Sequence, residues 1–265
     1  RLFGDYLGHA TTAVLNLDNA ETRALAAASP GAMSFGVDTG DARFVARAVS
    51  PEPWGVSFAV VDKAAGETAQ VSLKTPGRHN VSNALAAIAA ARAIGVSLRE
   101  AADALGRFEG VRRRLEIAGQ AGGVVVIDDF AHNPDKIAAT LRTLREHDGR
   151  ILALFQPHGF GPLKLMGAEI ADAFAENLRA DDYLAVPEPV YYGGTTDRAV
   201  SSADIVSKLR AKGVRAEAFA TREAAFAPLV ERARPGDRIV VMGARDDTLS
   251  QFATDLVAAI GARLG

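Results

Sequence analysis

The second half of the chain alternates short apolar runs with longer segments of helical periodicity. The apolar runs are residues 123–128, 151–155, 183–186, 214–219 and 238–242, and the helical segments are residues 134–147, 166–178, 202–212, 222–233 and 247–263. Strands this apolar, alternating with helices, are expected where both faces of a parallel sheet are covered. The pattern predicts an α/β fold with a doubly wound, mostly parallel sheet over residues 118–265.

The first part of the chain has shorter and less regular elements. The pattern predicts a strand at residues 13–18 and helices at residues 20–28, 80–94 and 97–105. Between residues 33 and 75, glycine and proline separate short β-prone runs, which indicates antiparallel hairpins. Because Gly119, Gly122 and Gly123 cluster in a short stretch, we expect two domains, residues 1–117 and 118–265.

Composition and charge narrow the class of protein. The 265 residues are 48% hydrophobic, enough for two packed cores, and carry a formal net charge of -2, which provides no global field for nucleic acid or an anionic membrane. The absence of cysteine excludes disulfides and thiolate metal sites. No apolar run approaches the roughly 20 residues that span a bilayer. We therefore expect a cytoplasmic protein with small-molecule partners.

Acidic and imidazole side chains follow the first strand of the predicted second domain. Asp128, Asp129 and His132 lie where this strand ends and a helix begins. Ligands of doubly wound sheets bind at the carboxyl ends of the strands, which favours a ligand site here. Helix capping by Asp129 or Asn133, with Pro134 in the first turn, explains the same residues, and both interpretations can hold together.

Two later segments lie at the same predicted edge. Gln156 and His158 follow the next strand, and Gly243 ends the last one. A simple connector would explain residues 155–162, which we interpret as a loop too rich in glycine and proline to begin a helix. The polar groups at a sheet edge favour ligand contacts instead.

Two further motifs precede the second domain. Arg112, Arg113 and Arg114 offer rigid forks of donors that suit a phosphate or carboxylate, and their mutual repulsion favours an anionic partner over a solvated charge run. His79 and Asn80 precede a helix whose first turn has free N–H groups, and an asparagine can recognise both edges of a base. Taken alone, the second motif is explained more simply by a plain helix cap.

Taken in order, these segments resemble the Mur ligase family, ATP-dependent amide ligases of bacterial cell-wall precursor synthesis. The matching segments are residues 13–18, 77–83, 108–114, 127–132, 155–158 and 243–244. The resemblance covers nearly the whole chain. It implies a partial central ATPase-type domain followed by a Rossmann-like C-terminal domain.

The resemblance also implies two sets of site residues. The ATP-binding set is His79, Asn80, Arg113, Arg114, Asp128 and Asp129, and the set that binds the incoming amino acid or peptide is His158, Ser201 and Gly243. The first two would contact adenine, the arginines the phosphates and the aspartates the ribose. Arg113 and His132 would be the catalytic residues. We expect the arginines and the aspartate pair to face each other across an interdomain crevice.

Family chemistry activates a carboxylate with ATP and Mg²⁺ as an acyl phosphate, which an amine attacks to form an amide. The implied substrates are an amino acid or peptide and a UDP-N-acetylmuramate-type acceptor. The family's Gly-Lys-Thr phosphate loop, its magnesium ligands and the lysine carbamylated in some members are missing from these residues. We therefore expect a fragment of a longer protein that ligates nothing by itself.

One departure leaves the substrates open. Gly159 stands where the alanine-adding members of the family have an arginine after Gln-Pro-His. Two alternatives remain. One is a noncatalytic pair of domains that binds nucleotide or muropeptide, and the other is a related ligase that acts on another acceptor such as folate.

Overall fold

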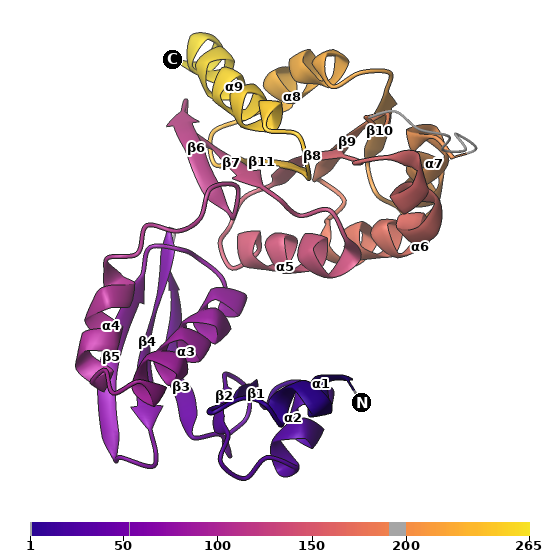
Figure 1. Ribbon diagram of the computed structural model, residues 1–265. Helices are drawn as coiled ribbons and strands as arrows, with labels where there is room; N and C mark the ends of the chain where they lie inside the picture. The colour runs from indigo at the N-terminus through magenta and orange to yellow at the C-terminus, as the bar shows by residue number, and fades with distance from the viewer. Residues whose placement is uncertain (1, 53, 191–199) are drawn as a thin grey trace. The chain divides into compact units, whose positions relative to one another are not determined.

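The computed structural model describes residues 2–52, 54–190 and 200–265 of the chain (Figure 1). It contains two compact units, residues 1–110 and residues 111–265. The boundary expected between residues 117 and 118 falls inside strand β6, Glu116–Ala121, which belongs to the second sheet. The units divide earlier because residues 111–115 pack against the strands of the second unit.

The first unit is a five-stranded sheet in the order β1-β2-β3-β4-β5. Its strands are β1 Val14–Asn16, β2 Met33–Gly36, β3 Phe44–Glu52, β4 Gly55–Asp62 and β5 Glu67–Leu73. β3, β4 and β5 pair antiparallel, as the hairpin pattern predicts. For β2 the hairpin prediction is wrong, since β2 pairs parallel with both β1 and β3. Helix α2 intervenes between β1 and β2 and makes this parallel pairing possible.

Helices cover both faces of this first sheet. They are α2 Ala20–Ala27, α3 Arg78–Ala93 and α4 Leu98–Gly106, and a short α1, Leu2–Leu7, precedes them. α3 buries Val81, Leu85 and Ile88 at helical spacing against the same face as α4. α2 lies on the other face, where Leu17 and Val45 form a smaller core. Ser97 caps α4 through a reciprocal pair of hydrogen bonds with Glu100, as its sequence predicts.

The second unit is a six-stranded sheet in the order β10-β9-β8-β11-β7-β6. The strands after β6 are β7 Val124–Asp129, β8 Ile151–Gln156, β9 Tyr183–Pro187, β10 Ala216–Phe219 and β11 Arg238–Gly243. All pair parallel except β6, which is antiparallel to β7. The predicted mostly parallel, doubly wound α/β fold is thus confirmed.

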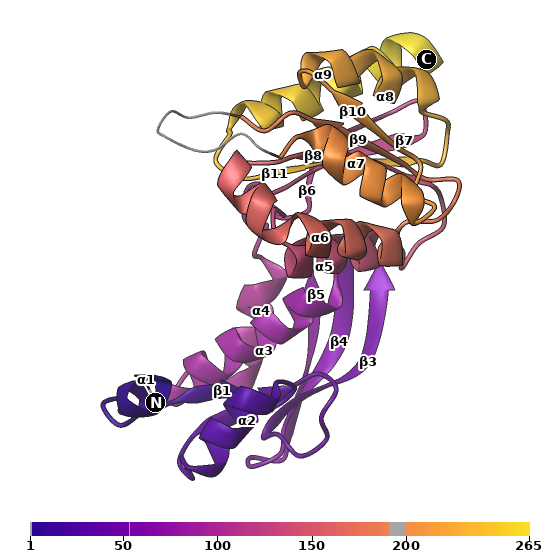
Figure 2. The same ribbon diagram turned by 90° about the vertical axis from the view of Figure 1, so that its right-hand side faces the viewer.

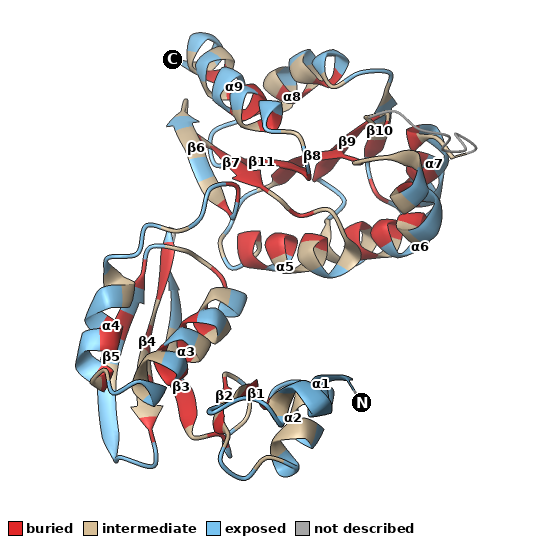
Figure 3. Cartoon of the chain, viewed as in Figure 1, coloured by how far each residue is buried: buried red, intermediate tan, exposed pale blue. Residues whose placement is uncertain are grey.

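Helices cover both faces of this sheet as well (Figures 1 and 2). α5 Pro134–Leu144, α6 Phe160–Asn177 and α7 Ser202–Ala211 pack on one face, and η1 Glu223–Ala225, α8 Phe226–Arg232 and α9 Thr248–Leu264 on the other. The central strands β8, β9 and β11 are buried along their whole length (Figure 3). This burial explains why their sequences are continuous apolar runs rather than alternating ones.

Two elements of this unit differ from the sequence prediction. β6 was not predicted, because its sequence Glu-Ile-Ala-Gly-Gln-Ala is short, half-exposed and weakly apolar. α6 begins at Phe160, whereas the prediction placed its start at residue 166 and a loop before it. Gly161 and Pro162 are accommodated because a helix tolerates proline in its first turn. Among the described residues, no helix is long and apolar enough to cross a membrane.

Candidate functional site

The three consecutive arginines form a tight turn at the start of the second unit, which we call the arginine turn, Arg112–Arg114. Its middle residue is buried, with 6% of its surface exposed, and has a left-handed backbone with φ of 58°. The Arg113 backbone N–H donates to Glu116 Oε2 at 2.7 Å, and its carbonyl accepts from the Phe130 N–H at 2.7 Å. The turn is therefore tied to both β6 and the segment after β7.

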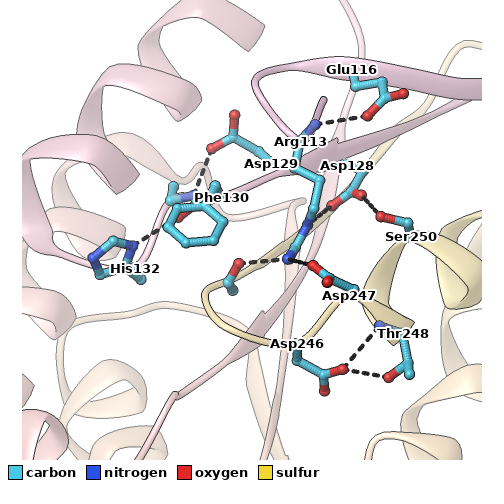
Figure 4. A network of polar contacts seen from close by, with 12 residues as sticks. Arg113, Glu116, Asp128, Asp129, Phe130, His132, Asp246, Asp247, Thr248 and Ser250 are labelled. Carbon is cyan, nitrogen blue, oxygen red and sulfur yellow. Dashed lines mark hydrogen bonds and ion pairs between the residues drawn. The ribbon is translucent and has the colours of Figure 1, made fainter. Parts of the chain in front are cut away.

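The buried guanidinium of Arg113 has acceptors on three sides (Figure 4). It donates to Asp128 Oδ1 at 3.4 Å, to the Gly243 carbonyl at 2.8 Å and to Asp247 Oδ1 at 3.5 Å. These partners are up to 134 residues away in sequence. Arg113 is thus an internal anchor that ties the arginine turn to the carboxyl ends of β7 and β11.

The acidic pair at the end of β7 is committed to the same local structure. Asp128 is 1% exposed, and its second oxygen accepts from Ser250 Oγ at 2.5 Å. Asp129 accepts from the Leu115 N–H at 2.7 Å, the Ala131 N–H at 2.9 Å and Thr140 Oγ1 at 3.0 Å. Every carboxylate oxygen of the pair therefore has a protein donor. Burial raises the pKa of Asp129, and these hydrogen bonds oppose the shift.

The arginine turn and the acidic pair lie in one unit and are in direct contact. The expectation that they face each other across an interdomain crevice is wrong. The arginines precede the predicted boundary in the sequence, but the three acceptors of the Arg113 guanidinium, Asp128, Gly243 and Asp247, all lie in the second unit. In this arrangement both aspartates are buried, with 1% and 5% exposure, and accept hydrogen bonds from protein donors.

The flanking arginines have the opposite character. Arg112 and Arg114 are exposed, and within the described ranges neither guanidinium pairs with a carboxylate. The Arg114 guanidinium lies 5.1 Å from the centre of the Phe130 ring. The turn, Phe130 and Asp247 line a surface hollow of about 360 Å³. Exposed guanidinium groups beside an aromatic ring suit an anion or a phosphorylated ring compound.

Two histidines meet beside the arginine turn. The rings of His132 and His158 are 5.0 Å apart in an edge-to-face arrangement. His132 Nδ1 lies 2.8 Å from the Phe130 carbonyl, which can only accept, so Nδ1 carries a proton and donates. Burial, and then the nearby His132 and Arg245, lower the pKa of His158. The structure thus brings together two imidazoles that come from different strand ends.

Backbone constraints explain two glycines at this edge. A Cβ on Gly243 would lie 2.7 Å from Leu249 Cδ1 and 3.0 Å from the Gln156 carbonyl oxygen, so any larger residue would require both neighbours to shift. The Gly243 carbonyl accepts a hydrogen bond from Arg113 Nη2. Gly159 has φ of 139°, a conformation that side-chain-bearing residues rarely adopt, and it directly precedes α6. An arginine at this position would require a different loop.

Ser201 has a clear structural role. It is the N-cap of α7, where its hydroxyl accepts from the Asp204 N–H at 3.3 Å and donates to Asp204 Oδ2 at 2.7 Å. The Ser201 backbone N–H also donates to Asp204 Oδ2 at 2.8 Å, which together with the first of these bonds completes a capping box. The sequence analysis gave Ser201 no capping role, and the substrate contact implied by the family resemblance stays a prediction.

His79 and Asn80 lie in the first turn of α3, in the first unit. Asn80 Nδ2 donates to the Pro76 carbonyl at 2.8 Å, and Asn80 Oδ1 accepts from Asn83 Nδ2 at 3.3 Å. Gly77, the N-cap, has φ of 99° and provides no side-chain cap. The Asn80 backbone N–H donates to the Gly77 carbonyl at 2.9 Å, so both the backbone and the side chain of Asn80 have protein partners.

Residues that complete the second-unit site were missed by the sequence analysis. Asp247 and Ser250 contact Arg113 and Asp128 from the start of α9, and Phe130 provides the aromatic wall. A weak signal existed, since Asp246 and Asp247 follow the end of β11 as Asp128 and Asp129 end β7. Across the part of the chain that the structure describes, no three histidine or acidic side chains cluster as a metal site would require.

The fold and the site define a class of protein: two α/β units, the second with a cationic hollow at the carboxyl ends of its parallel strands. Matches to family models identify the family. Residues 1–91 match the Mur ligase middle domain, and residues 113–245 match the Mur ligase glutamate ligase domain. The chain belongs to the Mur ligase family, as its motifs predict.

Individual relatives are consistent with this assignment. The chain is 40% identical over 195 residues to a UDP-N-acetylmuramate--L-alanine ligase of Cereibacter sphaeroides, covering 73% of this chain and 40% of that protein. It is 36% identical over 207 residues to the enzyme of that name from Streptomyces coelicolor, covering 76% and 43%. The chain thus spans about two-fifths of the length of the relatives that it matches.

Solved structures share the fold. The UDP-N-acetylmuramate-alanine ligase of Thermotoga maritima superimposes with a TM-score of 0.70 at 26% identity, covering 94% of this chain and 51% of that one. A pseudomurein peptide ligase type C of Methanothermus fervidus superimposes with a TM-score of 0.73 at 16% identity, covering 97% and 58%. The second likeness shows the fold alone.

Proposed function

We propose that this chain is the nucleotide- and amino-acid-handling part of an ATP-dependent amide ligase of peptidoglycan precursor synthesis. The reaction would join an amino acid or peptide to a UDP-N-acetylmuramate-type acceptor through an acyl phosphate. The observation that carries the proposal is the cationic hollow at the carboxyl ends of β7 and β11. The names of the relatives at 36–40% identity support the acceptor.

The chemistry of the donors in this hollow fits the phosphates of ATP. Arg114 and Arg112 offer exposed guanidinium groups that can bind phosphate oxygens in pairs. We assign phosphate binding to Arg114 first, because its guanidinium lies over Phe130 and is held at the hollow. Arg113 contributes by anchoring the turn. When bound, ATP supplies the phosphoryl group that activates the carboxylate.

The two histidines are assigned to the amine side of the reaction. An attacking amine must lose a proton, and an imidazole that is neutral near pH 7 can accept it. His158 has a lowered pKa, which keeps its ring neutral. Its ring packs edge-to-face on His132, so the two imidazoles are held side by side. His132 donates from Nδ1 to a carbonyl, so its Nε2 is directed elsewhere and can serve a substrate.

Two further assignments concern the adenine ring and the magnesium ion. We assign adenine contacts to His79 and Asn80 on the family resemblance, and both residues lie in the first turn of α3. The described residues hold no cluster of three or more histidine or acidic side chains. The family reaction uses Mg²⁺, which commonly binds one or two protein carboxylates together with substrate phosphates, and we assign this role to no particular residue of the chain.

The proposal is tested with the protein expressed from the complete reading frame that encodes these residues. We expect phosphate release from ATP only when a UDP-N-acetylmuramate acceptor and an amino acid or peptide are both present, with the new amide detected by mass spectrometry. An Arg114→Met variant should lose most of this activity. Arg142→Met, which removes an exposed arginine from α5, is the matched control and should keep it.

The other outcomes separate the alternatives. Phosphate release only with a pteroyl acceptor would replace the muramyl acceptor with a folate-type one. Tight nucleotide binding with no turnover on any acceptor would favour a noncatalytic binding protein. The 265 residues contain no Gly-Lys-Thr sequence, so we expect this chain alone to form no amide. Turnover by the 265-residue chain would contradict that expectation.

A further inference from the structure

The loop between β11 and α9, residues 244–247, is held from two sides. On one side, Asp247 and the preceding Gly243 carbonyl supply two of the three acceptors of the Arg113 guanidinium (Figure 4). Within the loop, Arg245 has a left-handed backbone with φ of 61°. A non-glycine residue in this conformation persists only where its surroundings hold it. The conformation of the loop therefore requires further contacts that hold it in place.

Those contacts come from Arg222, just before η1. Its Nη1 donates to Asp246 Oδ2 at 2.8 Å, and its Nη2 donates to Thr248 Oγ1 at 2.9 Å. Asp246 Oδ1 in turn accepts from the Thr248 N–H at 3.0 Å and from Thr248 Oγ1 at 2.5 Å. Arg222, Asp246 and Thr248 form a closed ring of hydrogen bonds, which we call the clasp.

The ion pair of the clasp is shielded from solvent, whereas its third member, Thr248, is exposed. The side chains of Arg222 and Asp246 are only 16% and 14% exposed. The Arg222 guanidinium lies 5.7 Å from the centre of the Phe252 ring, which packs edge-to-face on Phe226. Charge-assisted hydrogen bonds in such shielded positions are stronger than exposed ones.

We propose that Arg222 is a positioning residue for the candidate site. Through the clasp it fixes the β11–α9 loop, and the loop fixes the guanidinium of Arg113. Arg113 in turn holds the arginine turn, so that Arg112 and Arg114 stay ordered beside the hollow. The effect on phosphate binding rests on the proposed function, whereas the effect on the order of the turn does not.

Hydrogen exchange tests the ordering directly. The amides that report it are those of Arg113 and Leu115, whose hydrogen bonds to Glu116 and Asp129 hold the turn. In the protein from the complete reading frame, we expect Arg222→Met to raise exchange in the peptide over the turn about tenfold. Arg222→Lys should rescue part of the protection. Equal exchange in Arg222→Met and the wild type would overturn the proposal.

The matched control is Arg232→Met, on α8. Arg232 has an ion pair with Glu217 at 2.8 Å and lies 4.4 Å from the centre of the Tyr183 ring, so its loss costs similar contacts. It does not contact the β11–α9 loop, and exchange in the arginine turn should stay unchanged. Should Arg222→Met fail to fold, Thr248→Val removes the clasp hydroxyl with little change of shape and should raise the same exchange.

ADP binding separates the positioning from the proposed function. We expect Arg222→Met to weaken ADP binding about tenfold, with the control variant unchanged. Faster exchange with unchanged ADP affinity would overturn the link between the turn and phosphate binding. Faster exchange in a protein whose wild type binds no ADP would support the positioning and contradict the proposed function.

Discussion

The two ends of the second sheet both contain buried arginine–aspartate pairs, yet only one end has the features of a site. At the amino ends of the strands, Arg145 pairs with Asp182 and Arg150 with Asp237. At the carboxyl ends, Arg113 pairs with Asp128. A buried ion pair by itself therefore does not identify a functional site.

The difference lies in what surrounds each pair. Asp182 also accepts from the backbone N–H groups of Ile151 and Arg179 at 2.7 and 2.6 Å, so it joins three segments of the fold. Around Arg113, the neighbouring guanidinium groups are exposed, a hollow opens, and two imidazoles meet. The first arrangement is suited to stability and the second to binding. Variants at the two ends can test whether the amino ends serve stability and the carboxyl ends serve binding.

The largest expected effect is on stability at the amino ends. Asp182→Ala removes the carboxylate partner of Arg145, which keeps only carbonyl acceptors at Asn177 and Gly149, and leaves two backbone N–H groups without their acceptor. Breaking a buried pair in this way costs about 3–5 kcal/mol. Urea unfolding of the 265-residue chain measures this loss. Asp181→Ala, an exposed neighbour, should change stability by less than about 0.5 kcal/mol. Equal small effects of both changes would break the comparison.

The second effect is on ligand binding at the carboxyl ends. Arg114→Met removes an exposed guanidinium, and the loss of a charge-assisted bond to phosphate should weaken ADP binding by about 2 kcal/mol, roughly thirtyfold. Stability should fall by less than about 1 kcal/mol, since the substitution removes the contact with Phe130 and a charge attraction to Asp129 from an exposed side chain. Titration calorimetry on the protein from the complete reading frame measures the affinity. A large stability loss with unchanged affinity would mean that Arg114 belongs with the structural arginines.

The third effect is smaller and concerns a residue given a substrate role by the resemblance. Ser201→Ala removes the α7 cap and should cost about 1 kcal/mol in urea unfolding. Ser201→Asn keeps a capping side chain and should restore most of this stability. If both variants raise the KM for the amino acid, Ser201 contacts substrate. If neither does, the cap is its whole function.

The sequence predicts the second unit well because its signals are strong and local. Continuous apolar runs such as residues 151–155 become buried central strands, and helix caps such as Ser97 and Asn133 occur where they are predicted. The edge strand β6 was missed, because a half-exposed strand of alternating small and polar residues has no distinct pattern. The parallel pairing of β2 depends on its neighbours in space, which no local pattern records.

The site was predicted less completely, for a related reason. Three consecutive arginines are chemically identical in the sequence, but only Arg113 is buried. Its burial depends on a left-handed backbone and on acceptors at Gly243 and Asp247, which lie more than 100 residues away. The Arg222 clasp could not be predicted for the same reason. Sequence spacing locates the strand ends, and tertiary contacts decide which side chains remain free.

The smallest effect is a pH dependence at the carboxyl ends. Burial, with help from His132 and Arg245, lowers the pKa of His158 in the folded protein, whereas an unfolded histidine titrates near 6.5. As the pH falls through this range, the unfolded chain binds the proton first, so His158 makes stability fall with falling pH. Above the unfolded pKa both states are neutral and the contribution disappears.

His158→Gln tests this sign. We expect the free energy of unfolding of the wild type to fall more steeply than that of the variant between pH 7.5 and pH 5.5. This range extends about one pH unit to either side of the pKa of an unfolded histidine, where its protonation changes most. The difference at pH 8 gives the packing change alone and serves as the baseline. A wild type that gains stability relative to the variant on acidification would mean that the folded site favours the protonated ring. The imidazole would then be suited to binding an anion rather than to accepting a proton from an amine.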